Sequence, residues 1–415
     1  MSFGEVPAYR VQTLNTLAFP KGQVPRCEMT GLPARVQCIT PHITLYFVSK
    51  ECAKQAWYGI MHKIAPLLGP LRTPCLVVGT EEDRAKREYT MEMSKKALVD
   101  LCSQEAEKFL VERQYDLAIP GALQAVTFLR EIYGDGAIEM IGPFMQLAEA
   151  HLGLGRAREA AEVLGRATWT VSKNPDCSNS MKSQLHRNIG KLHLSQNKLD
   201  EALAELSHDI YFSSLEMGPE HIETSVGYYH IASVFYAQHK IENALAFYDK
   251  VVDIWYRFLL AARRDTNLVD SVSESQLSQA GDMLDHVLRT RAKLLGDTHI
   301  ATGEAKYTVG LLHLVANNVE KARDAIQAAL ATYIDHLGPD HPSTKHIQDT
   351  HDACPLPKAP PGQVIAFGDD ADDADAAGDT LHGHTFGAID AHFPSQMPRA
   401  ATQSPIPLVP EGAGL

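Results

Sequence analysis

The chain has 415 residues, of which 45% are apolar and 21% charged, and its formal net charge is −13. This length allows two or three domains, and no run of eighteen apolar residues is present to form a membrane-spanning helix. The acidic balance disfavours nucleic acid and anionic membranes as partners, because both would repel it. Seven scattered cysteines and an N-terminus without a signal-like apolar core predict a reducing, cytoplasmic environment.

Residues 1–26 show no clear period and are predicted to be an N-terminal extension. Its apolar side chains are candidates to lie along the folded body: Tyr9, Val11, Leu14, Leu17 and Phe19.

Residues 27–75 carry cysteine, tryptophan and histidine in a suggestive order: Cys27, Cys38, Cys52, Trp57 and His62. Order and spacing resemble a MYND-type zinc finger, and the resemblance implies two interleaved zinc sites. The first would use Cys27, Thr30, Phe47 and Cys52, and the second Cys38, Pro41, His62 and Ala65. Half of these residues cannot coordinate zinc, whereas a structural site needs four nitrogen or sulfur ligands.

We therefore expect a degenerate finger without metal, in which Cys27, Cys38, Cys52 and His62 are remnant ligand positions. Packing of Leu45, Phe47, Trp57 and Ile60 would hold it together. A zinc ion held with help from His42 is the less favoured alternative. No other cofactor is expected.

Residues 76–96 are predicted to form a linker helix that leads into a repeat array over residues 97–352. The helical pattern runs from Thr80 to Gln114, and the acids Glu81, Glu82 and Asp83 at its start complement the helix dipole.

The array is indicated by small and apolar residues that return at a step of 42. Four tracks keep this step: Ala106, Ala148, Gly190 and Ala232; Ala118, Ala160, Ala202 and Ala244; Ala122, Leu164, Leu206 and Tyr248; and Ala125, Ala167, Asp209 and Val251. After a break, Gly310, Ala322, Ile326 and Ala329 repeat them. Apolar spacings of three and four within each half predict helical hairpins in which small residues let two helices approach closely.

This pattern resembles the tetratricopeptide repeat (TPR), and the strings that begin at Gly218, Gly296 and Gly338 resemble its kinesin-light-chain variety. The predicted fold is an all-α TPR superhelix preceded by the degenerate finger. Each of these glycines is expected to be a left-handed helix cap, and His221, His299 and His341 to bond turn backbone. The 78-residue step from Gly218 to Gly296 predicts an irregular unit, with a loop from Arg263 to Glu274 and a long helix from Gln276 to Leu295.

Residues 353–415 hold eight acidic and two basic residues and are rich in Pro, Ala and Gly. Such a segment cannot bury enough apolar surface to fold alone, so a disordered acidic tail is expected. His382 and His384 would bind metal only weakly there.

No phosphate loop, nucleophile elbow, His-Glu-x-x-His or Asn-His-x-Cys motif is present in the sequence, so we expect no catalytic site. We expect instead a partner-binding groove on the leading helices of the repeats. Its predicted residues are Met145, Leu152, Arg187, Lys191, Leu194, Tyr229, Tyr236 and Tyr307. Exposed aromatic and arginine side chains are common interface anchors and would suit an acidic helix or extended peptide. The alternative is that these residues pack against neighbouring helices or the chain's own tail.

Several strings within residues 15–260 resemble a ciliary family that combines a MYND finger with TPR helices and lacks a SET domain. They begin at Leu17, Leu67, Cys177, Leu185, Asp209 and Gly227. The resemblance implies a non-catalytic subunit of the axoneme in cilia and flagella, linked to inner dynein arms together with another axonemal TPR protein. A soluble cytosolic TPR adaptor or assembly factor that binds a client peptide is the alternative.

Overall fold

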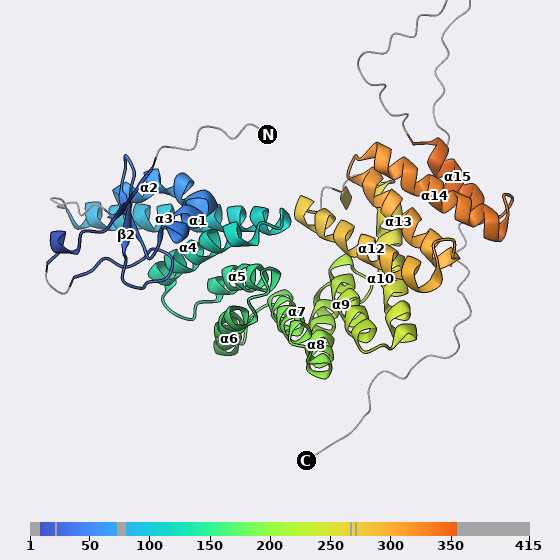
Figure 1. Ribbon diagram of the computed structural model, residues 1–415, viewed down its shortest axis with the longest axis horizontal. Helices are drawn as coiled ribbons and strands as arrows, with labels where there is room; N and C mark the ends of the chain where they lie inside the picture. Colours follow the sequence, from blue (N-terminus) through green and yellow to red (C-terminus); the bar gives the residue numbers. More distant parts are fainter. Residues whose placement is uncertain (1–8, 21–22, 73–79, 266–267, 270–271, 355–415) are drawn as a thin grey trace, which may run out of the picture.

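The computed structural model describes residues 9–20, 23–72, 80–265, 268–269 and 272–354. Within these residues a small sheet-containing unit is followed by an arc of helices (Figure 1). The predicted tail beyond residue 354, with His382 and His384, lies outside the described residues, as do Cys75 and the first residues of the predicted linker.

The N-terminal unit is built on a three-stranded antiparallel sheet in the order β1-β2-β3. Its strands are β1 (Arg10–Thr13), β2 (Val36–Ile39) and β3 (Thr44–Phe47), and the 3-10 turn η1 (Thr16–Ala18) follows the first. The chain continues through α1 (Lys50–Ala56), the π-helical turn η2 (Trp57–Met61) and α2 (His62–Arg72). Because β1 pairs with β2, residues 10–13 belong to the finger, which corrects the predicted boundary at residue 27.

The predicted packing of the finger is confirmed. Leu45, Phe47, Trp57 and Ile60 are all buried in one apolar cluster. Tyr9 stacks on Trp57 with ring centroids 4.6 Å apart. Leu14 is also buried, whereas Leu17 is 92% exposed, so only part of the expected N-terminal row lies on the body.

The predicted linker helix and the first leading helix form one continuous helix, α3 (Glu81–Val111). Thr80 caps it: its hydroxyl accepts the Asp83 N–H, and the Asp83 carboxylate accepts the Thr80 N–H. The acids of the first turn explain why the start was readable from sequence.

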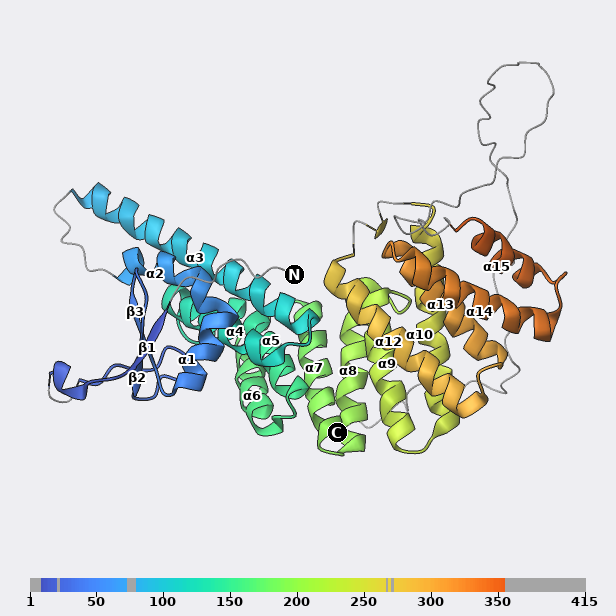
Figure 2. The same ribbon diagram turned by 45° about the horizontal axis from the view of Figure 1, so that its top comes forward.

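The described residues of the array form five helical hairpins, which follow one another along the arc (Figures 1 and 2). They pair α3 with α4 (Tyr115–Tyr133), α5 (Ile141–Gly153) with α6 (Ala157–Lys173), α7 (Asn179–Ser195) with α8 (Leu199–Met217), α9 (Ile222–Ala237) with α10 (Ile241–Ala262), and α13 (Ile300–Val315) with α14 (Val319–Leu337). A 3-10 turn, η3 (Ile138–Met140), precedes α5, and α15 (Pro342–Asp352) follows α14. The all-α TPR-like superhelix predicted for this region is confirmed.

The small-residue tracks lie where two helices of a hairpin meet. Every alanine of the first two tracks is at most 1% exposed. A Cβ added to Gly190 would lie 2.6 Å from Leu206 Cγ, and one added to Gly310 would lie 2.5 Å from Ile326 Cγ1. A larger side chain at these positions would therefore force the helices apart.

The turn inside each hairpin has the same conformation, although its residues differ in chemistry, and it keeps the step of 42 over the first four hairpins. The turn residue has φ between 58° and 70° in every hairpin: Arg113, Gly155, Asn197, His239 and Asn317. The N–H of each following residue donates to the carbonyl oxygen five positions earlier at 2.8–2.9 Å, as in the bond from Lys240 to Phe235. This left-handed turn closes the first helix of every hairpin.

The turn between hairpins uses glycine differently from the prediction. Gly218, Gly296 and Gly338 have φ between 84° and 98° but ψ between 156° and 164°. These angles lie outside the left-handed helical region, in a region that only glycine populates freely. The predicted role of the histidines is confirmed, because the Nδ1 atoms of His221, His299 and His341 each accept a backbone N–H two residues ahead at 3.2 Å.

The irregular unit contains an extra helix, α12 (Glu274–Leu295), between the fourth and fifth hairpins. It packs against α13 and also contacts α3, whose C-terminal end lies beside it in both views (Figures 1 and 2). Arg113, just after α3, forms an ion pair with Asp282 of α12. Two segments far apart in sequence therefore meet.

Candidate partner-binding surface

Arg187 was predicted to face a partner, but its guanidinium is bound to other residues inside the array. Its Nε and Nη2 donate to the two carboxylate oxygens of Asp209 at 3.0 and 3.2 Å. Ser183 Oγ donates to the same carboxylate at 2.5 Å, and Asp209 is fully buried. Nη2 also donates to the Glu223 carbonyl oxygen at 3.2 Å. The predicted exposure of Arg187 is therefore wrong.

Lys191, the second predicted cation, is also paired. Its Nζ lies 3.1 Å from a Glu149 carboxylate oxygen on the preceding leading helix. The positive charge of Lys191 lowers the pKa of Glu149, and that of Arg187 acts in the same direction. The positive charge predicted for Arg187 and Lys191 in the middle of the groove is thus largely neutralised by the protein's own carboxylates.

Four of the apolar groove residues pack within the array. Met145 is 6% exposed and Tyr307 is fully buried, with its hydroxyl 2.9 Å from Thr350 Oγ1. Leu152 and Leu194 are half-buried against neighbouring core clusters. The alternative of packing against neighbouring helices therefore holds for Met145 and Tyr307, which no partner can reach in this structure.

Tyr229 and Tyr236 of α9 remain half-buried and face α12. The Tyr229 ring makes an edge contact with His286 at 5.5 Å between centroids, and Lys293 Nζ donates to the Tyr236 hydroxyl at 3.3 Å. Burial raises the pKa of Tyr229 to about 12, so its hydroxyl stays protonated at neutral pH. These two rings are the predicted groove residues that keep both an aromatic surface and a nearby cation.

Two cations of α12 complete this surface and were missed from the sequence. Arg289 and Lys293 are exposed, one helical turn apart, and neither forms an ion pair within the described residues. Arg289 Nε donates only to the Asp285 carbonyl oxygen of its own helix, at 3.2 Å. We call Tyr229, Tyr236, Arg289 and Lys293 the tyrosine–cation strip.

The sequence did contain a signal for these cations. The apolar face of α12 comprises Met283, Leu284, Val287 and Leu288. Its opposite face must carry other residues of the helix, including Arg289 and Lys293 at a spacing of four. The helix lies outside the 42-residue step, so counting along the repeat tracks passed over it.

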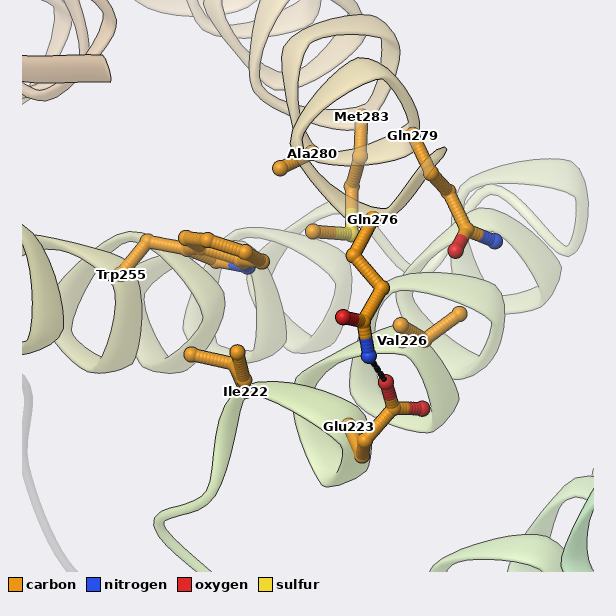
Figure 3. Close-up of a pocket in the computed structure, with 8 residues that line it drawn as sticks. All are labelled: Ile222, Glu223, Val226, Trp255, Gln276, Gln279, Ala280 and Met283. Carbon is orange, nitrogen blue, oxygen red and sulfur yellow. Dashed lines mark hydrogen bonds between the residues drawn. The ribbon is translucent and has the colours of Figure 1, made fainter. Parts of the chain in front are cut away.

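A narrow crevice lies beside the strip between α9, α10 and α12 (Figure 3). Glu223 and Gln276 are hydrogen-bonded across it, and Trp255 of α10 points into it. Its space of about 240 Å³ includes volume open to solvent, and the enclosed part has room for about one water molecule.

The remnant zinc positions are only partly brought together. The sulfurs of Cys27 and Cys52 lie 3.9 Å apart, as expected for one site, but Phe47 fills its ligand position as a buried core residue. Cys38 is fully buried, which raises the pKa of its thiol to about 11, and His62 Nδ1 lies 2.8 Å from the Trp57 carbonyl oxygen. Across the described part of the chain, no three His, Cys, Asp or Glu side chains are grouped to hold a metal ion. The residues present do not fit a structural zinc.

Among the described helices, none is both long and apolar enough to cross a membrane.

Comparison with known proteins identifies one repeat directly. Residues 304–343 match the tetratricopeptide repeat family model. Similar solved structures include the nearly identical TPR-like repeats of a putative kinesin light chain from Podosopora anserina, with 13% identity, coverage of 58% of this chain and 96% of that chain, and a TM-score of 0.33. Another is BtubC (BKLC) from P. vanneervenii, with 15% identity, coverage of 62% and 99%, and a TM-score of 0.30. The family match covers most of the α13–α14 hairpin, so the chain contains a tetratricopeptide repeat there, and repeats of this type serve as protein-interaction scaffolds.

Proposed function

We propose that this protein is a non-catalytic interaction subunit of the ciliary or flagellar axoneme that helps to dock or assemble inner dynein arms. The observation that carries the proposal is the tyrosine–cation strip on a TPR array. The strip offers aromatic surface together with two cations, Arg289 and Lys293, that form no ion pair within the described residues. Aromatic and arginine side chains supply much of the binding energy at protein interfaces.

The chemistry of the strip selects for an acidic partner segment. Arg289 and Lys293 would pair with carboxylates, while Tyr229 and Tyr236 would be covered by apolar or aliphatic groups of the same segment. We propose that this segment is a helix or an extended peptide from an inner-arm dynein component or from another axonemal TPR protein.

The axonemal location rests on the sequence resemblance to the family of zinc finger MYND domain-containing protein 12. One of the resembling strings begins at Gly227 and contains Tyr229 itself. The resemblance therefore reaches the surface that we assign to partner binding.

The test is retention in axonemes. We would express the double variant Tyr229→Ala/Tyr236→Ala and the charge reversal Arg289→Glu/Lys293→Glu in cells that lack the native protein. Each should weaken binding by about 2 kcal/mol or more, roughly thirtyfold, if the strip holds the hot spots. Both variants should then be lost from salt-washed axonemes, and the partner should no longer co-purify.

Matched controls lie on the second helices. Tyr211 of α8 is 58% exposed, and Arg158 of α6 is exposed, so Tyr211→Ala and Arg158→Glu test aromatic loss and charge reversal away from the strip. Circular dichroism should show the same helix content for all variants. Full retention of both strip variants would exclude the strip as the docking surface. If the unaltered protein washes out with detergent, the soluble adaptor is the correct class.

A further inference from the structure

Two cysteines of the N-terminal unit face each other from different elements. Cys27 lies in the loop before β2, and Cys52 lies in the first turn of α1, where its N–H donates to Ser49 Oγ at 3.1 Å. Their sulfurs are 3.9 Å apart, and a disulfide would require them to move closer by about 2 Å. Cys27 is 3% exposed, while Cys52 is partly open to solvent.

The surroundings favour a dithiol over a metal site. The other two positions of the corresponding zinc site hold Thr30 and the buried ring of Phe47, so the described residues supply no third ligand beside the pair. The two thiols are in hydrogen-bond contact, and either can be the donor. Because Cys52 is partly open to solvent, a small oxidant can reach the pair beside it, and the thiolate form of either sulfur is the one that reacts.

We propose that Cys27 and Cys52 form a redox-active dithiol that a peroxide closes to a disulfide. One of the two sulfurs, as its thiolate, attacks an oxygen of the peroxide, the O–O bond breaks, and a sulfenic acid forms on that sulfur. The leaving hydroxide takes up the proton that the attacking thiol had released. The other sulfur then attacks the sulfenic sulfur, the S–O bond breaks, and the S–S bond forms. The second hydroxide takes the proton of that second thiol, so the two sulfurs lose two electrons and hydrogen peroxide becomes two waters.

The pair is placed to act on the junction between the finger and the repeats. Glu28, next to Cys27, accepts two bonds from the Arg72 guanidinium at 2.8 Å each. The Glu28 carbonyl oxygen accepts the side-chain N–H of Gln124 in α4 at 3.0 Å. A disulfide at Cys27 would fix this loop against α1 and hold the contact with the first hairpin in place.

The experiment uses the full chain, reduced and then treated with hydrogen peroxide, followed by alkylation of free thiols and mass spectrometry. We expect two thiols to be lost together, with a cross-linked pair of peptides that contain Cys27 and Cys52, and full reversal by dithiothreitol. Hydrogen exchange of residues 26–32 should slow in the oxidised form. A cross-link between other cysteines, or irreversible oxidation of Cys27 alone, would overturn the proposal.

Single variants test the pair. Cys27→Ser and Cys52→Ser should each give no cross-link, and dimedone should trap a sulfenic acid at the cysteine that remains. Cys102→Ser, at a buried cysteine of α3, is the control and should leave the cross-link unchanged. The peptide map of the unaltered chain decides the question even if a variant folds poorly. Close to one zinc per purified chain that protects both thiols until a chelator removes it would also refute the dithiol.

Discussion

The Asp209 carboxylate occupies a position that is small or apolar in the other repeats, and the Arg187 guanidinium binds both of its oxygens. The equivalent pair one repeat earlier is Ala167 with Met145, each 42 positions before its counterpart. One repeat therefore holds its hairpin with a buried ion pair where its neighbour uses apolar packing.

Removing one member of this pair should be costly. Asp209→Ala leaves the Arg187 cation buried without its carboxylate, which typically costs about 3 to 5 kcal/mol. The double variant Arg187→Met/Asp209→Ala copies the preceding repeat and should recover most of that loss. Thermal and urea unfolding of both single variants and the double variant test this coupling. If the double variant loses as much free energy of unfolding as Arg187→Met and Asp209→Ala lose together, the two residues are not coupled.

The sequence predicted the hairpins well because their contacts follow a fixed step, but it did not predict which side chains a partner can reach. The sequence showed Asp209 as the one charged residue in its 42-residue track, and it placed Arg187 among the predicted groove residues. Their pairing depends on how two neighbouring helices pack, which the repeat step alone does not specify. Arg289 and Lys293 were missed for the opposite reason, since their helix interrupts the step.

Close approach inside the hairpins gives a second prediction. Gly190→Ala places a methyl group 2.6 Å from Leu206 Cγ and should destabilise the chain by about 1 to 3 kcal/mol. Gly165→Ala in α6 is the matched control, because its added Cβ meets nothing within 4 Å. That change should be neutral or stabilising by up to about 1 kcal/mol. We expect Gly190→Ala to lower the melting temperature and Gly165→Ala to leave it unchanged or raise it. A lower melting temperature for Gly165→Ala alone would contradict the close contact described at Gly190.

The left-handed turns predict a stabilising change. His239 has φ of 60°, whereas Asn197 and Asn317 occupy the same position in other hairpins. Asparagine tolerates this conformation better than most residues, so His239→Asn should stabilise the chain by a few tenths to about 1 kcal/mol. Gly155→Ala, at the equivalent turn, should destabilise it by about 1 kcal/mol. Unfolding curves of the two variants should shift in opposite directions.

Buried histidines predict that stability falls in mild acid. Burial lowers the pKa of His230 well below its usual value, and the charges of Lys191 and Arg187 add to this effect. Below about pH 6.5 the unfolded chain therefore binds a proton that the folded chain refuses, so the free energy of unfolding decreases as the pH falls. The contribution of neutral His230 to the free energy of unfolding is fully present above that pH.

The variant that tests the assignment is His230→Asn, because Asn188 stands at the same position one repeat earlier. Melting temperatures at pH 5.5 and 7.5 should lie closer together for this variant than for the unaltered chain. His208→Asn, at an exposed histidine of α8, should leave the difference unchanged. If the melting temperature depends on pH in the same way in all three proteins, groups other than His230 cause that dependence.

Metal content provides a separate check on the finger. Each remnant site keeps two of four ligand positions, so purified protein should contain far less than one zinc per chain. Chelator treatment should leave the melting curve in place. Unfolding on chelation, together with release of stoichiometric zinc, would show that a metal stabilises this unit.

The contact between α3 and α12 links the first hairpin of the array to a helix near its other end. In an open stack the first unit has one neighbour and frays before the others. Here the first hairpin packs against both the finger and α5, and the C-terminal end of α3 also contacts α12, where Arg113 and Asp282 are paired. The end of α3 is therefore joined to a helix that lies far later in the chain, so a cut within α12 should loosen it.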